Sequence, residues 1–272
     1  MNPVSVNELT ESVNSNLPRD VKSHIAKNIL TKEKDSETAK NIFAELINDL
    51  SLKTQKEVIN ATGTLLHTNL GRSPNKISYP GTYTNIEYDL TTLSRGKRNE
   101  YLSVLMNNLI GSEDIIFVNN NASSLFVSLK AISKLHNIES VIISRGEIIE
   151  IGGSYRLPEI INETGLSLVE IGTTNKTRLS DYKKALEKYP NSLILKVHRS
   201  NFSISGFTED VSISELAELK NKYDVFLLHD LGSGLVIDKK FLEINNVNIF
   251  RDEPFVQDSL SDGSDLVMFS GD

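Results

Sequence analysis

Val225-Phe-Leu-Leu-His-Asp-Leu-Gly-Ser-Gly234 is a short apolar run that leads into a histidine, an aspartate and a glycine-rich turn. Such a run, bounded by turn residues, predicts a buried strand. Similar apolar runs lie at 115–118, 141–143, 168–171, 193–197 and 266–269. Segments with apolar residues at helical spacing lie between most of them, at 122–135, 179–188 and 213–222. This alternation predicts right-handed βαβ units, and therefore an α/β fold with a mainly parallel sheet and flanking helices.

The first part of the chain differs in composition from the rest. Residues 1–56 are polar and contain no glycine. Apolar residues recur at helical spacing after about Arg19, and again after Ser36 and Thr38, which are candidate N-caps. We therefore predict a small helical N-terminal module at 1–56 and a larger domain at 57–272.

Composition excludes several classes of protein. The 272 residues carry 29 Lys and Arg against 36 Asp and Glu, a net charge of −7, which argues against a protein that coats nucleic acid, DNA included. The absence of cysteine removes disulfides and thiolate metal sites. No apolar run is long enough to span a membrane, and the N-terminus lacks the features of a signal peptide, so a cytoplasmic protein is expected.

Polar residues follow the predicted strands, at the sheet edge where α/β proteins bind ligands. The run Asn119-Asn-Asn-Ala-Ser-Ser124 precedes a predicted helix, so its small residues suit an anion or phosphate, although Asn121 or Ser123 could simply cap that helix. Asp230 could hold a protonated ring nitrogen, bind a metal, orient a histidine or satisfy turn amides. The sequence alone does not decide between these roles for either loop.

Histidines and arginines give weaker signals. His67, His198 and His229 lie beside predicted strand ends, but their spacing matches no metal-binding motif, so no metal site is expected. The loop that contains Arg95 and Arg98 is either a solvated surface loop or a bidentate anion site.

Many short motifs together resemble one family, the bacterial selenocysteine synthases, or L-seryl-tRNA(Sec) selenium transferases. The resemblance covers roughly residues 56–272 and rests on motifs that occur in the same order. They are Val58-Ile-Asn-Ala-Thr-Gly-Thr-Leu-Leu-His-Thr-Asn-Leu-Gly-Arg-Ser-Pro74, Asn85-Ile-Glu-Tyr-Asp-Leu90, Val118-Asn-Asn-Asn-Ala122, Ser144-Arg-Gly-Glu147, Glu150-Ile-Gly-Gly-Ser154, Glu170-Ile-Gly-Thr-Thr-Asn175, Lys196-Val-His198, Gly206-Phe-Thr-Glu209, Asp230-Leu-Gly-Ser-Gly234 and Phe269-Ser-Gly-Asp272.

The resemblance implies a pyridoxal 5'-phosphate enzyme with the fold-type-I large domain. It implies that Asp230 pairs with the pyridinium nitrogen of the cofactor. The cofactor phosphate would be held by residues at the start of the helix and by one further hydroxyl: Asn121, Ala122, Ser123 and Ser270. His198 would lie close to the ring or the substrate, and Arg95 with Arg98 would bind the selenium donor or its phosphate.

The implied reaction is a β-replacement that converts seryl-tRNA(Sec) to selenocysteinyl-tRNA(Sec), with selenophosphate as the donor. The N-terminal module would help to bind the tRNA through Arg19, Lys22, Lys27, Lys32 and Lys34, and the family forms homo-oligomers. In the family the Schiff-base lysine follows Ser-Gly-Asp directly, whereas this sequence stops at Asp272. Lys196, inside a predicted strand, is a poor substitute, so we expect a fragment that lacks the C-terminal small domain and is inactive by itself.

Two alternatives remain at this point. One is a related pyridoxal-phosphate lyase or aminotransferase-like enzyme that acts on a small amino acid. The other is a non-catalytic remnant that binds tRNA or a sister subunit.

Overall fold

The computed structural model describes residues 3–74, 81–152, 154–237, 239–245 and 253–272. The chain forms two compact units, Met1–Leu70 and Gly71–Asp272. The division falls after Leu70, whereas the sequence predicts a boundary between 56 and 57. Residues 54–70 hold only a short 3-10 turn, η1 (Thr68–Leu70), so no change of helical pattern marks the boundary seen here.

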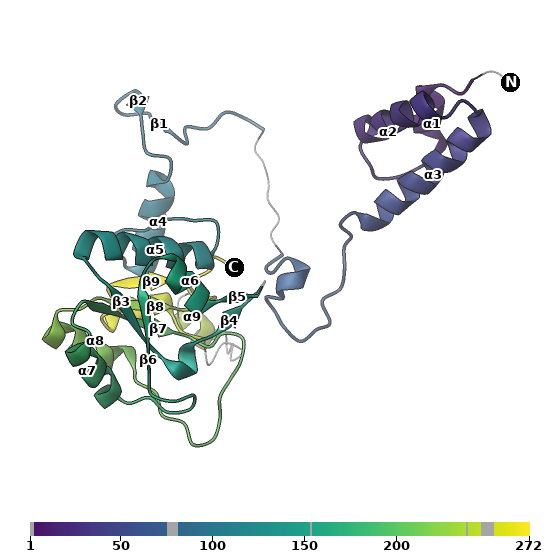
Figure 1. The fold of residues 1–272 in the computed structure, drawn as a ribbon. Helices are drawn as coiled ribbons and strands as arrows, with labels where there is room; N and C mark the ends of the chain where they lie inside the picture. Colours follow the sequence, from purple (N-terminus) through teal and green to yellow (C-terminus); the bar gives the residue numbers. More distant parts are fainter. Residues whose placement is uncertain (1–2, 75–80, 153, 238, 246–252) are drawn as a thin grey trace. The chain divides into compact units, whose positions relative to one another are not determined.

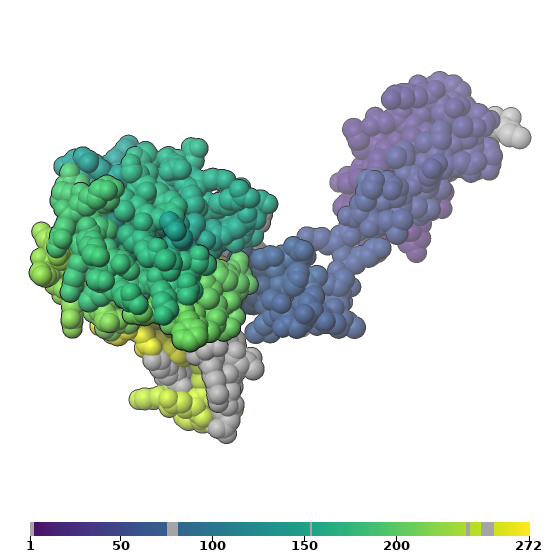
Figure 2. Space-filling view, turned by 60° about the horizontal axis from the view of Figure 1, so that its bottom comes forward, coloured from purple at the N-terminus to yellow at the C-terminus, as the bar shows by residue number. Residues whose placement is uncertain are grey.

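The first unit is a bundle of three helices, coloured purple to blue in Figures 1 and 2. The helices are α1 (Val6–Ser12), α2 (Arg19–Lys32) and α3 (Ser36–Lys53). Their apolar faces enclose one small core made of Leu9, Ala26, Ile29, Ala39, Phe43 and Ile47. The N-cap of α3 is Asp35, whose side chain accepts a 2.8 Å hydrogen bond from the Thr38 N–H, so the prediction of Ser36 or Thr38 as the cap is wrong by one position or more.

The second unit contains a five-stranded sheet in the order β6-β3-β7-β8-β9, with every pair of neighbours parallel. The strands are β3 (Ser140–Ser144), β6 (Ser167–Ile171), β7 (Ser192–Val197), β8 (Leu227–Asp230) and β9 (Leu266–Met268). All residues of β3, β7 and β8 are buried, as expected for central strands that are covered on both faces. The predicted α/β fold class is confirmed.

Helices cover both faces of this sheet (Figure 1). On one face α5 (Asn121–His136) and α6 (Leu157–Glu163) pack against Val141 and Ile143 of β3. On the other face α7 (Leu179–Lys188) and α8 (Ile213–Tyr223) pack against Ile142 of the same strand. Alternate residues of one strand therefore feed two separate cores.

The second unit contains several further elements, most of them short. They are α4 (Glu100–Ile110), α9 (Lys239–Ile244), α10 (Val256–Ser261), the 3-10 turn η2 (Arg145–Glu147), and the antiparallel pairs β1 (Tyr88–Asp89) with β2 (Ser94–Arg95) and β4 (Glu150–Ile151) with β5 (Tyr155–Arg156). Among the helices that the structure describes, none has the length and apolar character needed to cross a bilayer.

One predicted strand is wrong. Residues 115–118 join no strand pairing among the described residues, and Ile116 is 78% exposed. An apolar run gives no information about whether a partner strand is available. In this structure the sheet ends at β6 on one side and at β9 on the other. The apolar run at 225–228 predicts a strand there, whereas β8 begins at Leu227 and includes the histidine and the aspartate that follow the run.

Candidate active site

Asp230 is the last residue of β8, and it lies buried at the carboxyl edge of the sheet. Its Oδ1 accepts hydrogen bonds from the Gly232 N–H at 3.0 Å and from Asn121 Nδ2 at 2.7 Å. Burial raises the pKa of Asp230, and the two hydrogen bonds act in the opposite sense. The result is a rigid, desolvated carboxylate at the position where α/β proteins bind ligands.

The start of α5 lies beside this carboxylate. Asn120 is its N-cap, and its side chain accepts a 2.8 Å hydrogen bond from the Ser123 N–H, so the prediction of Asn121 or Ser123 as the cap is wrong. None of the described hydrogen bonds uses the N–H of Asn121 or Ala122. Two backbone donors at a positive helix end are therefore available for an anion.

His198 follows β7 directly and lies next to Asp230 along the edge. Val197 and Asp230 are register partners, and the His198 N–H donates a 2.8 Å hydrogen bond to the Asp230 carbonyl oxygen. The imidazole is partly buried, with Nε2 3.6 Å from Glu253 Oε2. The structure thus brings together His198, Asp230 and Asn121, which lie far apart in the sequence.

Ser270 reaches the same edge from the end of β9. Its N–H donates to the Gly232 carbonyl oxygen at 2.7 Å, in the turn that follows Asp230. Its hydroxyl accepts a 3.0 Å hydrogen bond from Arg72 Nη1 and donates to Asp272 Oδ2 at 2.9 Å. Arg72, which lies within the motif at 58–74, is a residue of this edge that the sequence pattern does not single out.

Arg95 and Arg98 form a separate cluster. Both guanidinium groups pair with Glu87, at 3.5 Å for Arg95, and both side chains are mostly exposed. Among the described contacts, none joins either arginine to the edge residues Asp230 or Ser270. Their role in binding an anion stays a prediction.

Lys196 is held inside the unit by two carboxylates. Its Nζ lies 2.5 Å from Glu147 Oε1 and 2.6 Å from Asp210 Oδ1. Burial by itself would lower the pKa of Lys196, but the two carboxylates outweigh it and raise that pKa. For the acid Glu147, burial has the opposite effect and raises the pKa to about 6, although Lys196 opposes the rise. The amine is therefore protonated and a poor nucleophile at neutral pH.

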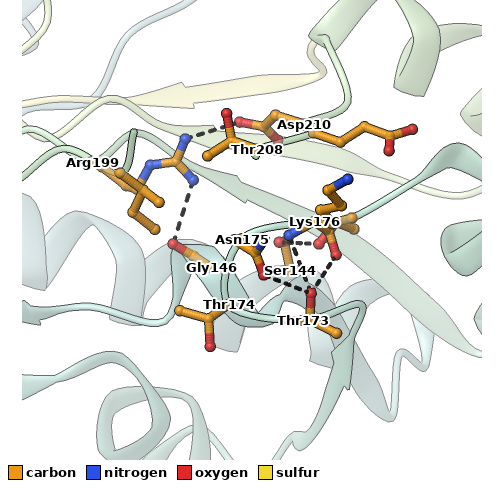
Figure 3. Close-up of a pocket in the computed structure, with 12 residues that line it drawn as sticks. Ser144, Gly146, Thr173, Thr174, Asn175, Lys176, Arg199, Thr208 and Asp210 are labelled. Carbon is orange, nitrogen blue, oxygen red and sulfur yellow. Dashed lines mark hydrogen bonds and ion pairs between the residues drawn. The ribbon is translucent and has the colours of Figure 1, made fainter. Parts of the chain in front are cut away.

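A small polar cavity of about 40 Å³ opens beside this network (Figure 3). Figure 3 shows Arg199 between the Asp210 carboxylate, at 3.3 Å, and the Gly146 carbonyl oxygen, at 3.5 Å. Residues after β3, β6 and β7 line it, and neither Asp230 nor His198 is among them. The cavity is therefore separate from the candidate active site.

His229 does not join the site. His229 is buried, with Nδ1 2.7 Å from Ser259 Oγ, and burial lowers its pKa to about 3. His67 lies in the first unit. In the part of the chain that the structure describes, no three His, Asp or Glu side chains gather into a metal-binding group.

Comparison with known proteins decides the family. The family model described as L-seryl-tRNA selenium transferase matches residues 58–272, which contain the whole edge described above. The chain belongs to the L-seryl-tRNA selenium transferase family. The family is pyridoxal-phosphate-dependent, in agreement with the resemblance drawn from the motifs.

Similar curated proteins carry the same description. The L-seryl-tRNA(Sec) selenium transferase of Campylobacter fetus subsp. fetus is 39% identical over 264 residues, which cover 93% of this chain and 58% of that protein. The one of Moorella thermoacetica is 45% identical over 224 residues, which cover 80% of this chain and 46% of that protein. The chain thus spans about half the length of these selenium transferases.

A solved structure of D-glucosaminate-6-phosphate ammonia-lyase is also similar to this chain. Its TM-score is 0.48 at 16% identity, and the match covers 63% of this chain and 43% of the lyase.

Proposed function

We propose that this chain forms the cofactor-binding part of an enzyme that converts seryl-tRNA(Sec) to selenocysteinyl-tRNA(Sec) with selenophosphate. Membership of the selenium transferase family supports the reaction. The observation that carries the site is the buried Asp230 carboxylate, fixed by Asn121 and Gly232 at the carboxyl edge of the sheet.

The residues at this edge fit pyridoxal phosphate. A ring with a protonated nitrogen needs a buried anion, and Asp230 supplies one. A phosphate needs several donors, and the Asn121 and Ala122 N–H groups with the Ser123 hydroxyl supply them at a helix start. Ser270 and Arg72 lie at the same edge, and both contact the Asp272 carboxylate, so they would bind a phosphate only by releasing Asp272. When bound, the cofactor supplies an electron sink for cleavage at the serine Cβ–O bond.

The protein groups hold the reacting parts in place. Asp230 keeps the ring nitrogen protonated, because a neighbouring anion in a desolvated site favours the charged form of its partner. His198 lies on the adjacent strand end, where its imidazole can bind or orient a substrate. Lys196 is not suited to bind the cofactor covalently, because Glu147 and Asp210 keep its amine protonated.

The three-helix unit is the proposed tRNA-binding element. Its exposed cations include Lys27 and Lys32 of α2, for which no partner is described. Arg19 pairs instead with Glu11, and Lys34 donates to the Leu30 carbonyl oxygen. Few phosphate contacts are therefore available, and the salt dependence of tRNA binding should be moderate.

Self-association is proposed from an apolar surface on the second unit. Tyr101, Val104 and Leu109 of α4 are 78%, 54% and 51% exposed, and Ile116 is also exposed. Exposed apolar residues gathered on one helix are typical of an interface. Sedimentation velocity should show a species larger than one 30.3 kDa chain, and Leu109→Lys should reduce its size.

Two binding measurements test the proposed function. Calorimetry with pyridoxine 5'-phosphate, which lacks the aldehyde and cannot react with surface lysines, tests the cofactor site. Filter binding of seryl-tRNA(Sec) tests the tRNA element, with an elongator seryl-tRNA as the control. Folded protein that binds neither ligand would overturn the proposal, and binding of the pyridoxine ester without tRNA preference would favour a related enzyme acting on small amino acids.

A further inference from the structure

The side chain of Asn121 is committed to Asp230. Its Nδ2 donates to Asp230 Oδ1 at 2.7 Å, and the Gly232 N–H donates to the same oxygen at 3.0 Å. Neither bond involves Oδ2 of the carboxylate. Two donors that converge on one oxygen fix the rotation of the carboxylate and leave its second oxygen for another group.

The other half of the Asn121 amide is equally informative. Its Oδ1 is buried and has no hydrogen-bond partner among the described residues. A carbonyl oxygen only accepts hydrogen bonds, and the oxygens of an ionised phosphate also only accept them. This buried oxygen would repel a phosphate and suits a ligand that brings a donor.

We propose that the side chain of Asn121 is a positioning residue that aims the Asp230 carboxylate at a ligand's ring nitrogen, and that it does not bind the phosphate. This inference rests on the proposed function for the identity of the ring. It leaves the phosphate to the backbone N–H groups of Asn121 and Ala122 and to the Ser123 hydroxyl. The assignment thus separates the backbone of Asn121 from its side chain.

The pKa of Asp230 depends on the Asn121 side chain, which supports the positioning role. Burial raises the pKa of Asp230, whereas the hydrogen bonds from Gly232 and Asn121 lower it. Removing the amide donor removes one of these two opposing contributions, so the pKa of Asp230 should rise further. A residue that only contacted the phosphate would leave this pKa unchanged.

The test compares Asn121→Leu with Asn162→Leu. Leu is close to Asn in shape, and Asn162 is exposed on α6, with no described hydrogen bond of its side chain. Asn121→Ala provides a second variant in case the Leu side chain prevents folding. The pKa of Asp230 is followed in the unliganded chain by carbon-detected NMR of its carboxyl group, identified with Asp230→Asn.

Ligand binding is measured on the same variants by calorimetry. Pyridoxine and pyridoxine 5'-phosphate share the ring, and only the second carries a phosphate. Loss of the aimed carboxylate should weaken both ligands by the same factor, about tenfold, the size expected for one hydrogen bond to a charged group. Ser123→Ala serves as the reference for a phosphate contact and should weaken the ester alone.

The outcomes separate the inference from the proposed function. A higher Asp230 pKa and equal losses for both ligands in the Asn121 variants, with Asn162→Leu unchanged, support the positioning role. An unchanged pKa, or a loss confined to the phosphate ester, overturns it. If the wild-type chain binds neither ligand, the proposed function fails, and the NMR titration still decides whether Asn121 controls Asp230.

Discussion

The backbone N–H of His198 donates a 2.8 Å hydrogen bond to the backbone carbonyl oxygen of Asp230. This bond extends the ladder between β7 and β8 by one residue beyond β7. The positions of both residues are therefore set by the most deeply buried part of the sheet, and not by a flexible loop. A rigid position is what a group that fixes a ligand requires.

Asp230→Asn should weaken binding of pyridoxine 5'-phosphate by about 10- to 100-fold, because a charge-assisted hydrogen bond to the ring nitrogen is lost. The melting temperature should change little, since an amide oxygen can still accept from Gly232 and Asn121. Calorimetry and thermal melting on one preparation measure both. Asp262→Asn, an exposed substitution, is the control, and wild-type affinity in Asp230→Asn would contradict the assignment.

Lys196 should not form a covalent adduct with pyridoxal phosphate. Its Nζ lies within 2.6 Å of a carboxylate oxygen of both Glu147 and Asp210, and these two acids keep the amine charged. No neutral amine is therefore available to react with an aldehyde. Borohydride reduction followed by peptide mass spectrometry should find only low, scattered labelling of lysines. A stoichiometric pyridoxyl group on Lys196 would show that the network opens when the cofactor binds.

Acid should destabilise the fold through His229. Burial lowers the pKa of this histidine to about 3, below the 6.5 of an unfolded chain. Between these pH values the unfolded chain binds a proton that the folded chain does not. The stability of the fold with neutral His229 is therefore complete above pH 6.5, and it is lost as the pH falls. The loss by pH 4.5 is about 2 to 3 kcal/mol.

Chemical denaturation at pH 7.0, 5.5 and 4.5 measures this effect. The free energy of unfolding should fall less steeply in His229→Asn than in the wild type. His24→Asn, a change at an exposed histidine, should keep the wild-type slope. Equal slopes in all three proteins would mean that His229 becomes protonated without cost in the folded state.

Reversal of two charges on α2 should weaken tRNA binding. Lys27→Glu with Lys32→Glu removes the proposed phosphate contacts, so affinity for seryl-tRNA(Sec) should fall at least tenfold. The slope of log Kd against log salt should decrease by about 0.7 to 0.9 for each lost contact. Lys183→Glu with Lys184→Glu on α7 makes the same change of net charge elsewhere. Equal losses in both double variants would indicate a general charge effect and not a site.

The sequence predicts the parts of the fold that local pattern controls. The run at 193–197 forms β7, and the helical spacing at 179–188 matches α7 at both ends, because strong periodicity and tertiary packing favour the same structure there. The failed strand at 115–118 shows the limit, because its pairing depends on a neighbour that no local pattern specifies.

The site shows the same limit. Polar residues after strands point to Asp230 and the loop before α5, because parallel strands end at one edge. The contact between Asn121 and Asp230 joins positions 109 apart, and the network around Lys196 joins positions 49 and 14 apart. Only the packed fold decides that Asn121 donates to a carboxylate and that protonated Lys196 is paired with two acids.

The contact of Arg72 with Asp272 also has a topological consequence. It brings two side chains that are 200 positions apart within 2.6 Å of each other. A segment that precedes every strand of the parallel sheet therefore lies against the segment that follows β9, and one ion pair closes a loop around the whole sheet.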